Sequence, residues 1–158
     1  WMMNSTIPTA VTCGAGRVNI PGAEIPETSS MIVEYPENYL LVFTLGYQAM
    51  RYHQSCDQMQ QFHGSRARFD LGRESWAVYP ESSAVDLKAS RERREPGSFE
   101  RASHAHVRNF LECVRSRRQP AATVEMGQST NIVLGRAVAS MRSGRRVAWD
   151  AAARKMSM

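Results

Sequence analysis

Apolar residues in the last third of the chain recur at the spacing of two helices. The first helix places four of them on one face: Val107, Phe110, Leu111 and Val114. These are positions i, i+3, i+4 and i+7, which meet on one side of a helix. Pro120 ends this helix. The second helix repeats the spacing at Leu134, Ala137, Val138 and Met141 and ends at Gly144. Each helix therefore has one side to bury.

The first eighty residues show the two-residue alternation of strands, interrupted by turn residues. The expected strands are 9–14, 31–35, 39–45, 56–63, 67–71 and 76–79, and residues 145–150 are also extended. Residues 39–45 are apolar on both faces, which predicts a central strand. Residues 81–100 are polar and rich in Arg and Glu, which predicts a surface excursion that is poorly ordered or weakly helical.

These elements predict an α+β fold. We expect an open, antiparallel-rich sheet of about five or six strands with two helices packed on one face. Phe110 and Leu134 should then be buried between the helices and the sheet.

Length and charge narrow the range of functions. The chain has 158 residues, which suits a single domain spanning 1–158. It begins with Trp1, which is not a start residue, so we expect a processed product or a piece of a longer protein. No apolar run approaches the roughly 20 residues of a membrane span. The net charge of +5 comes mainly from Arg clusters that are interrupted by Glu or lie at helix ends. We therefore expect neither nucleic acid nor a membrane as a partner.

Familiar catalytic and metal-binding patterns are missing from the sequence. His53 and Cys56 have a usable spacing for metal ligands, but no second pair stands at a fitting distance. Gly14-Ala15-Gly16 follows a strand, but Asn19 takes the place of a third glycine and no helical pattern follows. We expect no metal site, no dinucleotide site and no catalytic residue in this chain.

The order of the strands predicts a polar cluster at one edge of the sheet. If the strands alternate in direction, the loops 15–28 and 47–54 emerge at the same edge. Their candidates for contact with a substrate are Arg17, Asn19, Arg51, Tyr52 and His53. Guanidinium, amide, phenol and imidazole groups give the directional hydrogen bonds that suit a polyhydroxylated or carboxylated ligand. The alternative is that long loops are simply polar.

The strand 56–63 has a mixed face, on which polar Gln58 and Gln60 lie beside apolar Phe62. Faces of this kind suit a subunit interface, where apolar anchors stand among hydrogen-bonding groups. These three residues are therefore the candidates for self-association.

Three segments carry a resemblance to a known family: HVRNFLECVRSRRQP at 106–120, VEMG at 124–127 and GRRVAWD at 144–150. In this order and spacing they resemble the carboxyl end of glucose–fructose oxidoreductase/inositol dehydrogenase (Gfo/Idh/MocA) family proteins. Looser similarity extends through residues 62–67 and 1–3. The turn 64–67 departs from the family pattern, because Ala67 stands where a second glycine is usual.

The resemblance implies a second, α+β domain that would follow an amino-terminal dinucleotide-binding Rossmann domain. The family's cofactor loop and reacting residues lie before this segment, so this chain would hold no cofactor and would be inactive alone. NAD(P) is expected for the full-length protein. Some family members are NAD-dependent glycosidases rather than net oxidoreductases.

The leading hypothesis is the substrate-binding and oligomerisation domain of an NAD(P)-dependent sugar or cyclitol oxidoreductase. Its expected partners are the Rossmann domain, a sugar-like substrate and further copies of the chain through the sheet. The alternative is a stand-alone binding or assembly module that uses the open sheet face. The cytoplasm is favoured as the compartment over export.

Overall fold

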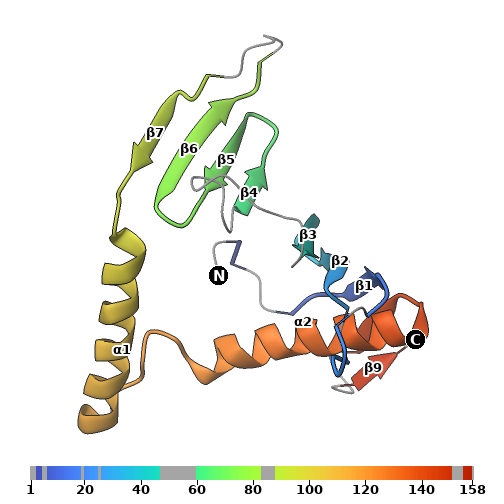
Figure 1. Ribbon diagram of the computed structural model, residues 1–158. Helices are drawn as coiled ribbons and strands as arrows, with labels where there is room; N and C mark the ends of the chain where they lie inside the picture. Colours follow the sequence, from blue (N-terminus) through green and yellow to red (C-terminus); the bar gives the residue numbers. More distant parts are fainter. Residues whose placement is uncertain are drawn as a thin grey trace. The chain divides into compact units, whose positions relative to one another are not determined.

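The computed structural model describes residues 3–4, 7–18, 20–24, 26–46, 60–82, 88–150 and 155–157. The chain divides into two compact units, one made of Trp1–Met50 with Ala122–Met158 and the other of Arg51–Ala121. Figure 1 shows the elements of both units. Each unit is described separately below.

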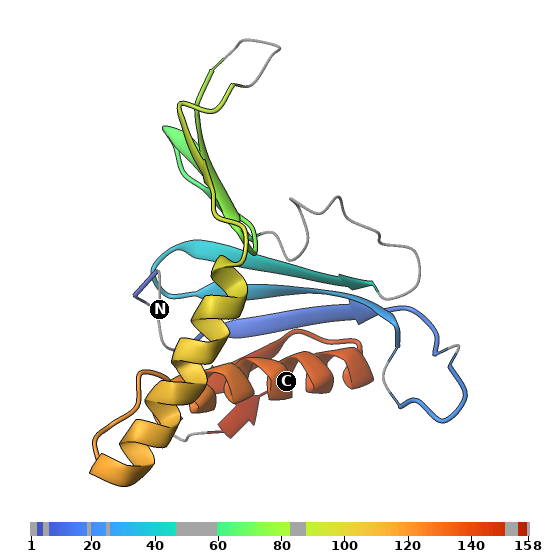
Figure 2. The same cartoon turned by 60° about the vertical axis from the view of Figure 1, so that its left-hand side comes forward.

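The first unit is a five-stranded antiparallel sheet with one helix on it. The strand order is β3-β2-β1-β8-β9. Its elements are β1 (Ala10–Ala15), β2 (Thr28–Tyr35), β3 (Tyr39–Gly46), α2 (Val124–Ser143), β8 (Val147–Asp150) and β9 (Lys155–Ser157). Figure 2 shows α2 running along one face of the sheet, below β1. The chain therefore brings its last strands beside its first one.

Tight turns and caps fix where these elements begin and end. β2 and β3 form a hairpin in which the Asn38 N–H donates to the Tyr35 carbonyl at 3.2 Å, and Asn38 takes the left-handed conformation at φ 61°. Asparagine tolerates this conformation better than most residues. α2 begins where the Thr123 hydroxyl accepts from the Met126 N–H, and it ends at left-handed Gly144.

The core of the first unit lies between α2 and the middle of the sheet. Its buried members are Val11, Met31, Val33 and Ala137. Val11 is paired with Val33 in the sheet register, so both side chains point to the helix side. Alternate residues of β1 and β2 thus supply one packed face.

The second unit is a four-stranded antiparallel sheet followed by a helix. The strand order is β4-β5-β6-β7. Its elements are β4 (Gln60–His63), β5 (Ala67–Leu71), β6 (Ser75–Pro80), β7 (Arg91–Arg94) and α1 (Ser98–Ser116). Phe62, Phe69 and Trp76 form an aromatic row on one face, with ring centroids 5.9 and 6.2 Å apart. The predicted excursion at 81–100 is thus partly wrong, because β7 pairs with β6 inside it and α1 begins there.

The α+β class and the antiparallel pairing are confirmed, but the single sheet is wrong. The described strands form two sheets, of five and four strands. β3 lies at the end of its sheet rather than at the centre, with Leu40 and Val42 exposed at 64% and 67%. Apolar residues on both faces showed that β3 is extended, but they could not show how many neighbours it has.

The predicted burial of Phe110 and Leu134 is also wrong. Phe110 is 58% exposed and Leu134 is 49% exposed. α1 has no buried residue, whereas α2 buries Ala137 against the first sheet. Helical spacing places apolar residues on one side of a helix, but it does not say what covers that side.

Candidate functional site: an arch between two strands

The loop between β1 and β2, residues 16–27, is closed at its base and is called the arch below. At the base the Gly16 N–H donates to the Thr28 carbonyl at 2.9 Å, which continues the pairing of the two strands. A Cβ on Gly16 would lie 3.2 Å from the Thr28 hydroxyl oxygen, a tighter contact than side chains usually make. Glycine at this position therefore lets the two strands close the arch.

A buried carboxylate holds the inside of the arch. One Glu27 carboxylate oxygen accepts from the Ile20 N–H at 2.6 Å, and Glu27 is buried. The Ala23 N–H donates to the Ile20 carbonyl at 3.1 Å, and Gly22 has φ 81°. Pro21 followed by Gly22 at positive φ suits a type II turn from Ile20 to Ala23. The described residues of the arch are therefore joined by internal hydrogen bonds.

Arg17 stands at the base of this arch, and its residue is exposed. It directly follows Gly16, so the closing bond of the arch fixes the backbone from which its guanidinium extends. Asn19, Arg51, Tyr52 and His53, the other candidates for substrate contact, lie outside the described residues. The meeting of the loops 15–28 and 47–54 therefore stays a prediction.

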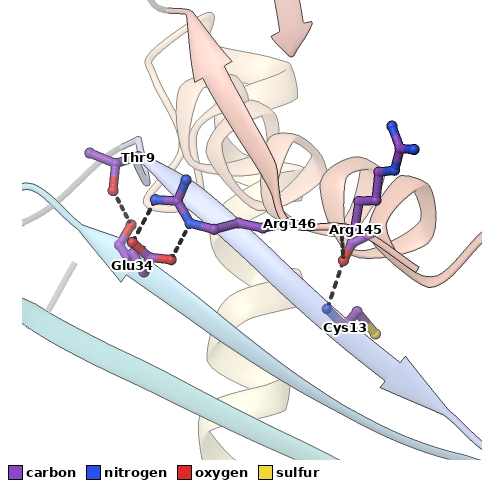
Figure 3. Close-up of polar contacts among 6 residues, drawn as sticks. Thr9, Cys13, Glu34, Arg145 and Arg146 are labelled. Carbon is purple, nitrogen blue, oxygen red and sulfur yellow. Dashed lines mark hydrogen bonds and ion pairs between the residues drawn. The ribbon is translucent and has the colours of Figure 1, made fainter. Parts of the chain in front are cut away.

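Ser140 of α2 binds β1 just before the arch. Its hydroxyl oxygen accepts from the Cys13 N–H at 2.8 Å, and the hydroxyl donates to the Arg145 carbonyl at 2.6 Å. Figure 3 shows these contacts at Cys13 and Arg145. Ser140 is fully buried. Sequence reasoning missed Ser140, although its position three residues after Ala137 places it on the apolar side of α2.

On the opposite face of the sheet, Arg146 forms a two-pronged ion pair with Glu34. Its Nε and Nη2 donate to the two carboxylate oxygens at 2.6 and 2.7 Å (Figure 3). The hydrogen bond from Arg146 lowers the pKa of Glu34 from its ordinary value. The pair therefore stabilises the fold at neutral pH, and this contribution is lost as the pH falls below the usual range of a glutamate. Both side chains are partly exposed, so we expect less than about 1 kcal/mol.

Arg136 lies fully buried one turn before Ser140 on α2. Its Nη1 donates to the Pro8 carbonyl at 2.6 Å, and its guanidinium carbon lies 4.7 Å from the centre of the Trp149 ring. Its Nε and Nη2 have no hydrogen-bond partner among the described residues. Burial lowers the pKa of this guanidinium from its ordinary value, and the nearby Tyr35 partly opposes that shift. Sequence reasoning missed this residue.

The second sheet has two chemically different faces. Gln60 and Phe62 share the face of the aromatic row, as expected from their alternation, and Gln58 lies outside the described residues. On the other face Arg68 binds both carboxylate oxygens of Asp70 at 2.9 and 3.1 Å. The Arg68 guanidinium also lies 4.6 Å from the centre of the Tyr79 ring. Self-association through the face of Gln60 and Phe62 stays a prediction.

No group of three or more His, Cys, Asp or Glu residues in the described part of the chain could hold a metal ion. Nor does that part contain a helix long and apolar enough to cross a membrane. Burial raises the pKa of the Cys13 thiol, which favours its protonated, unreactive form.

No protein-family model and no curated protein matches the chain. Solved structures do match it. An oxidoreductase from Agrobacterium radiobacter, solved with NAD+, L-tartaric acid and magnesium, is 12% identical with a TM-score of 0.64, over 90% of this chain and 43% of that one. A putative oxidoreductase, yvaA, from Bacillus subtilis is 15% identical with a TM-score of 0.62, over 91% and 46%. A UDP-N-acetylglucosamine 3-dehydrogenase from Acidithiobacillus ferrooxidans is 10% identical with a TM-score of 0.59, over 87% and 42%.

These matches establish a shared fold. The chain spans less than half the length of each of these proteins. The α+β fold expected from the sequence is therefore shared with the matched part of these oxidoreductases.

Proposed function

We propose that this chain is the carboxyl-terminal, substrate-binding part of an NAD(P)-dependent sugar or cyclitol oxidoreductase of the Gfo/Idh/MocA family. The observation that carries this proposal is the fold match, which covers 90% of the chain but 43% of an oxidoreductase solved with NAD+. The residues 1–158 would then act together after a Rossmann domain that binds the cofactor. The sequence resemblance at 106–120 and 144–150 points to the same family.

The arch supports a role in binding a substrate. A ligand site needs polar groups held in place before the ligand arrives, because ordering them on binding costs affinity. The base of the arch holds the backbone around Arg17, and Glu27 fixes its interior. A guanidinium in this setting donates in parallel to neighbouring hydroxyl or carboxylate oxygens. The net reaction, oxidation or transient oxidation during glycoside hydrolysis, depends on groups outside this chain.

This proposal predicts that the isolated chain interacts with sugars but not with NAD+. Sugars such as myo-inositol and glucose, added at millimolar concentration, should shift the NMR signals of the Ile20 amide and the Arg17 Nε–H. NAD+ should shift neither, because neither of the helices that the structure describes begins in a glycine-rich loop that could hold its pyrophosphate. Arg17→Gln should weaken the sugar-dependent shifts, whereas Arg142→Gln on the exposed side of α2 should leave them unchanged. Micromolar NAD+ binding by calorimetry would overturn the proposal.

The alternative, an assembly module, rests on the mixed face of the second sheet. Gln60 and Phe62 lie on the face of the aromatic row, where a second copy could bury them. If that face forms a dimer, Gln60→Glu should shift the dimer towards monomer, because a symmetric contact repeats the added charge. Gln61→Glu is the matched control, since Gln61 is the next residue of the same strand and faces the other way. Light scattering on the wild type and both variants, at tens of micromolar protein, measures whether each is a dimer or a monomer. A wild-type monomer at that concentration would contradict the assembly-module hypothesis.

A further inference from the structure

β1 pairs with strands on both sides at its first two residues and with one strand over the rest of its length. Ala10 and Val11 pair with β2 on one side and with Ala148 and Val147 of β8 on the other. From Thr12 onward the described pairing is with β2 alone. Continuing the register of β1 with β8 would place Arg145 opposite Cys13. A strand end paired on one side opens more easily than one paired on both.

Ser140 occupies the place where the ladder between β1 and β8 would continue. Its hydroxyl accepts from Cys13 and donates to Arg145, the two residues that the register would bring opposite each other. One hydroxyl thereby satisfies a strand N–H and a carbonyl that would otherwise be left without these bonds. Ser140 itself is fully buried and both of its contacts are partly buried, so water has limited access to these groups.

The part of β1 from Thr12 to Ala15, which pairs with β2 alone, leads directly into the arch. Three residues after Cys13, Gly16 closes the base of the arch with Thr28. The position of Gly16, and of Arg17 after it, therefore depends on how firmly this end of β1 is held. The ion pair between Arg146 and Glu34 joins the start of β8 to β2, but it makes no bond with β1. Among the described groups, the Ser140 hydroxyl is what holds the Cys13 N–H.

We propose that Ser140 is a positioning residue for the arch: acting through Cys13, it fixes the end of β1 and so the base from which Arg17 extends. Ser140 itself would touch no ligand. The importance of the arch for a ligand rests on the function proposed above, whereas the mechanical link from Ser140 to the arch does not.

Amide hydrogen exchange followed by NMR, without any ligand, tests this link. In Ser140→Ala, exchange at Gly16 and Ile20 should become at least about tenfold faster, a change equivalent to about 1.4 kcal/mol. Exchange at Val33 and Leu41, in the body of β2 and β3, should change by less than about threefold, since only a local opening is made easier. Ser129→Ala is the matched control, because among the described groups this hydroxyl of the same helix donates to the Glu125 carbonyl within the helix.

A pair of variants of equal shape separates the hydroxyl from packing. Ser140→Thr and Ser140→Val add the same bulk, and they differ in the hydroxyl group. The Thr variant should keep slow exchange at Gly16 and Ile20, and the Val variant should lose it, even if both are less stable than the wild type. Equal exchange at Gly16 in the two variants overturns the proposal, as does an equal acceleration at Val33 and Gly16 in Ser140→Ala. Because no ligand is present, this outcome is independent of whether sugars bind.

Discussion

Replacing Val33 with alanine is expected to lower the free energy of unfolding by about 2 kcal/mol, within a range of roughly 1–3 kcal/mol. Val33 is 0% exposed and packs with Val11 and Ala137 between the first sheet and α2. Removing two methyl groups there loses their burial and leaves a cavity that the surrounding strands cannot close fully.

The matched control for Val33→Ala is Val42→Ala. Val42 is in the neighbouring strand, but it is 67% exposed, so its loss should change stability by less than about 0.5 kcal/mol. Urea unfolding followed by circular dichroism gives both values. Equal effects of the two substitutions would mean that α2 does not cover the sheet as described.

Replacing Arg136 with alanine is expected to cost about 2–4 kcal/mol, whereas replacing it with methionine should cost less than about 1 kcal/mol. Alanine removes the side chain that fills the space between α2, Pro8 and Trp149. Methionine loses the bond to Pro8, but it fills much of the same space and suits the face of an aromatic ring. It also removes a buried charge whose Nε and Nη2 lack partners among the described residues.

Arg136→Lys distinguishes the role of the charge from that of the volume. Lysine keeps a buried positive charge without the planar group that stacks on Trp149. The Arg136→Lys variant should therefore be less stable than the Arg136→Met variant. Arg142→Ala, on the exposed side of the same helix, should have almost no effect. Denaturant unfolding of these four variants, three at Arg136 and one at Arg142, ranks them by their free energy of unfolding. A methionine variant as unstable as the alanine variant would show that the guanidinium contributes through its bonds rather than its volume.

Much of the local structure could be predicted from residue spacing. The strand expected at 67–71 is β5, and the turn expected at 36–38 joins β2 to β3. Proline, glycine and two-residue alternation act over a few residues, so their effects are visible in the sequence. The end of α2 at Ser143, which Gly144 follows, could be predicted for the same reason.

What depends on distant residues could not be predicted in this way. β1 pairs with β8, which lies more than 130 positions later, and no spacing rule gives that partner. The division into two sheets and the exposed position of β3 depend on such pairings as well.

In the candidate site, too, the features set by neighbouring residues could be predicted and those that depend on distant contacts could not. The order of the strands pointed to the loop 15–28 that forms the arch, and Arg17 was selected for its chemistry. The carboxylate of Glu27 that shapes the arch was missed, because its partner is the backbone of Ile20 and any residue could supply that N–H. The roles of Ser140 and Arg136 were missed for the same reason, since both bind backbone atoms of β1 or the residues before it.

The end position of β3 has a consequence for how protein made as this chain alone behaves in concentrated solution. The residues Tyr39 to Gly46 include no charged side chain and no proline, and apolar groups stand exposed on both faces of the strand. Such a strand is a template for pairing with the same strand of another molecule, and from there for aggregation during refolding. In natural proteins a charged gatekeeper residue often interrupts such an apolar strand. Val42 is the most exposed apolar residue of β3, so a lysine there would interrupt the apolar run at the least cost in stability.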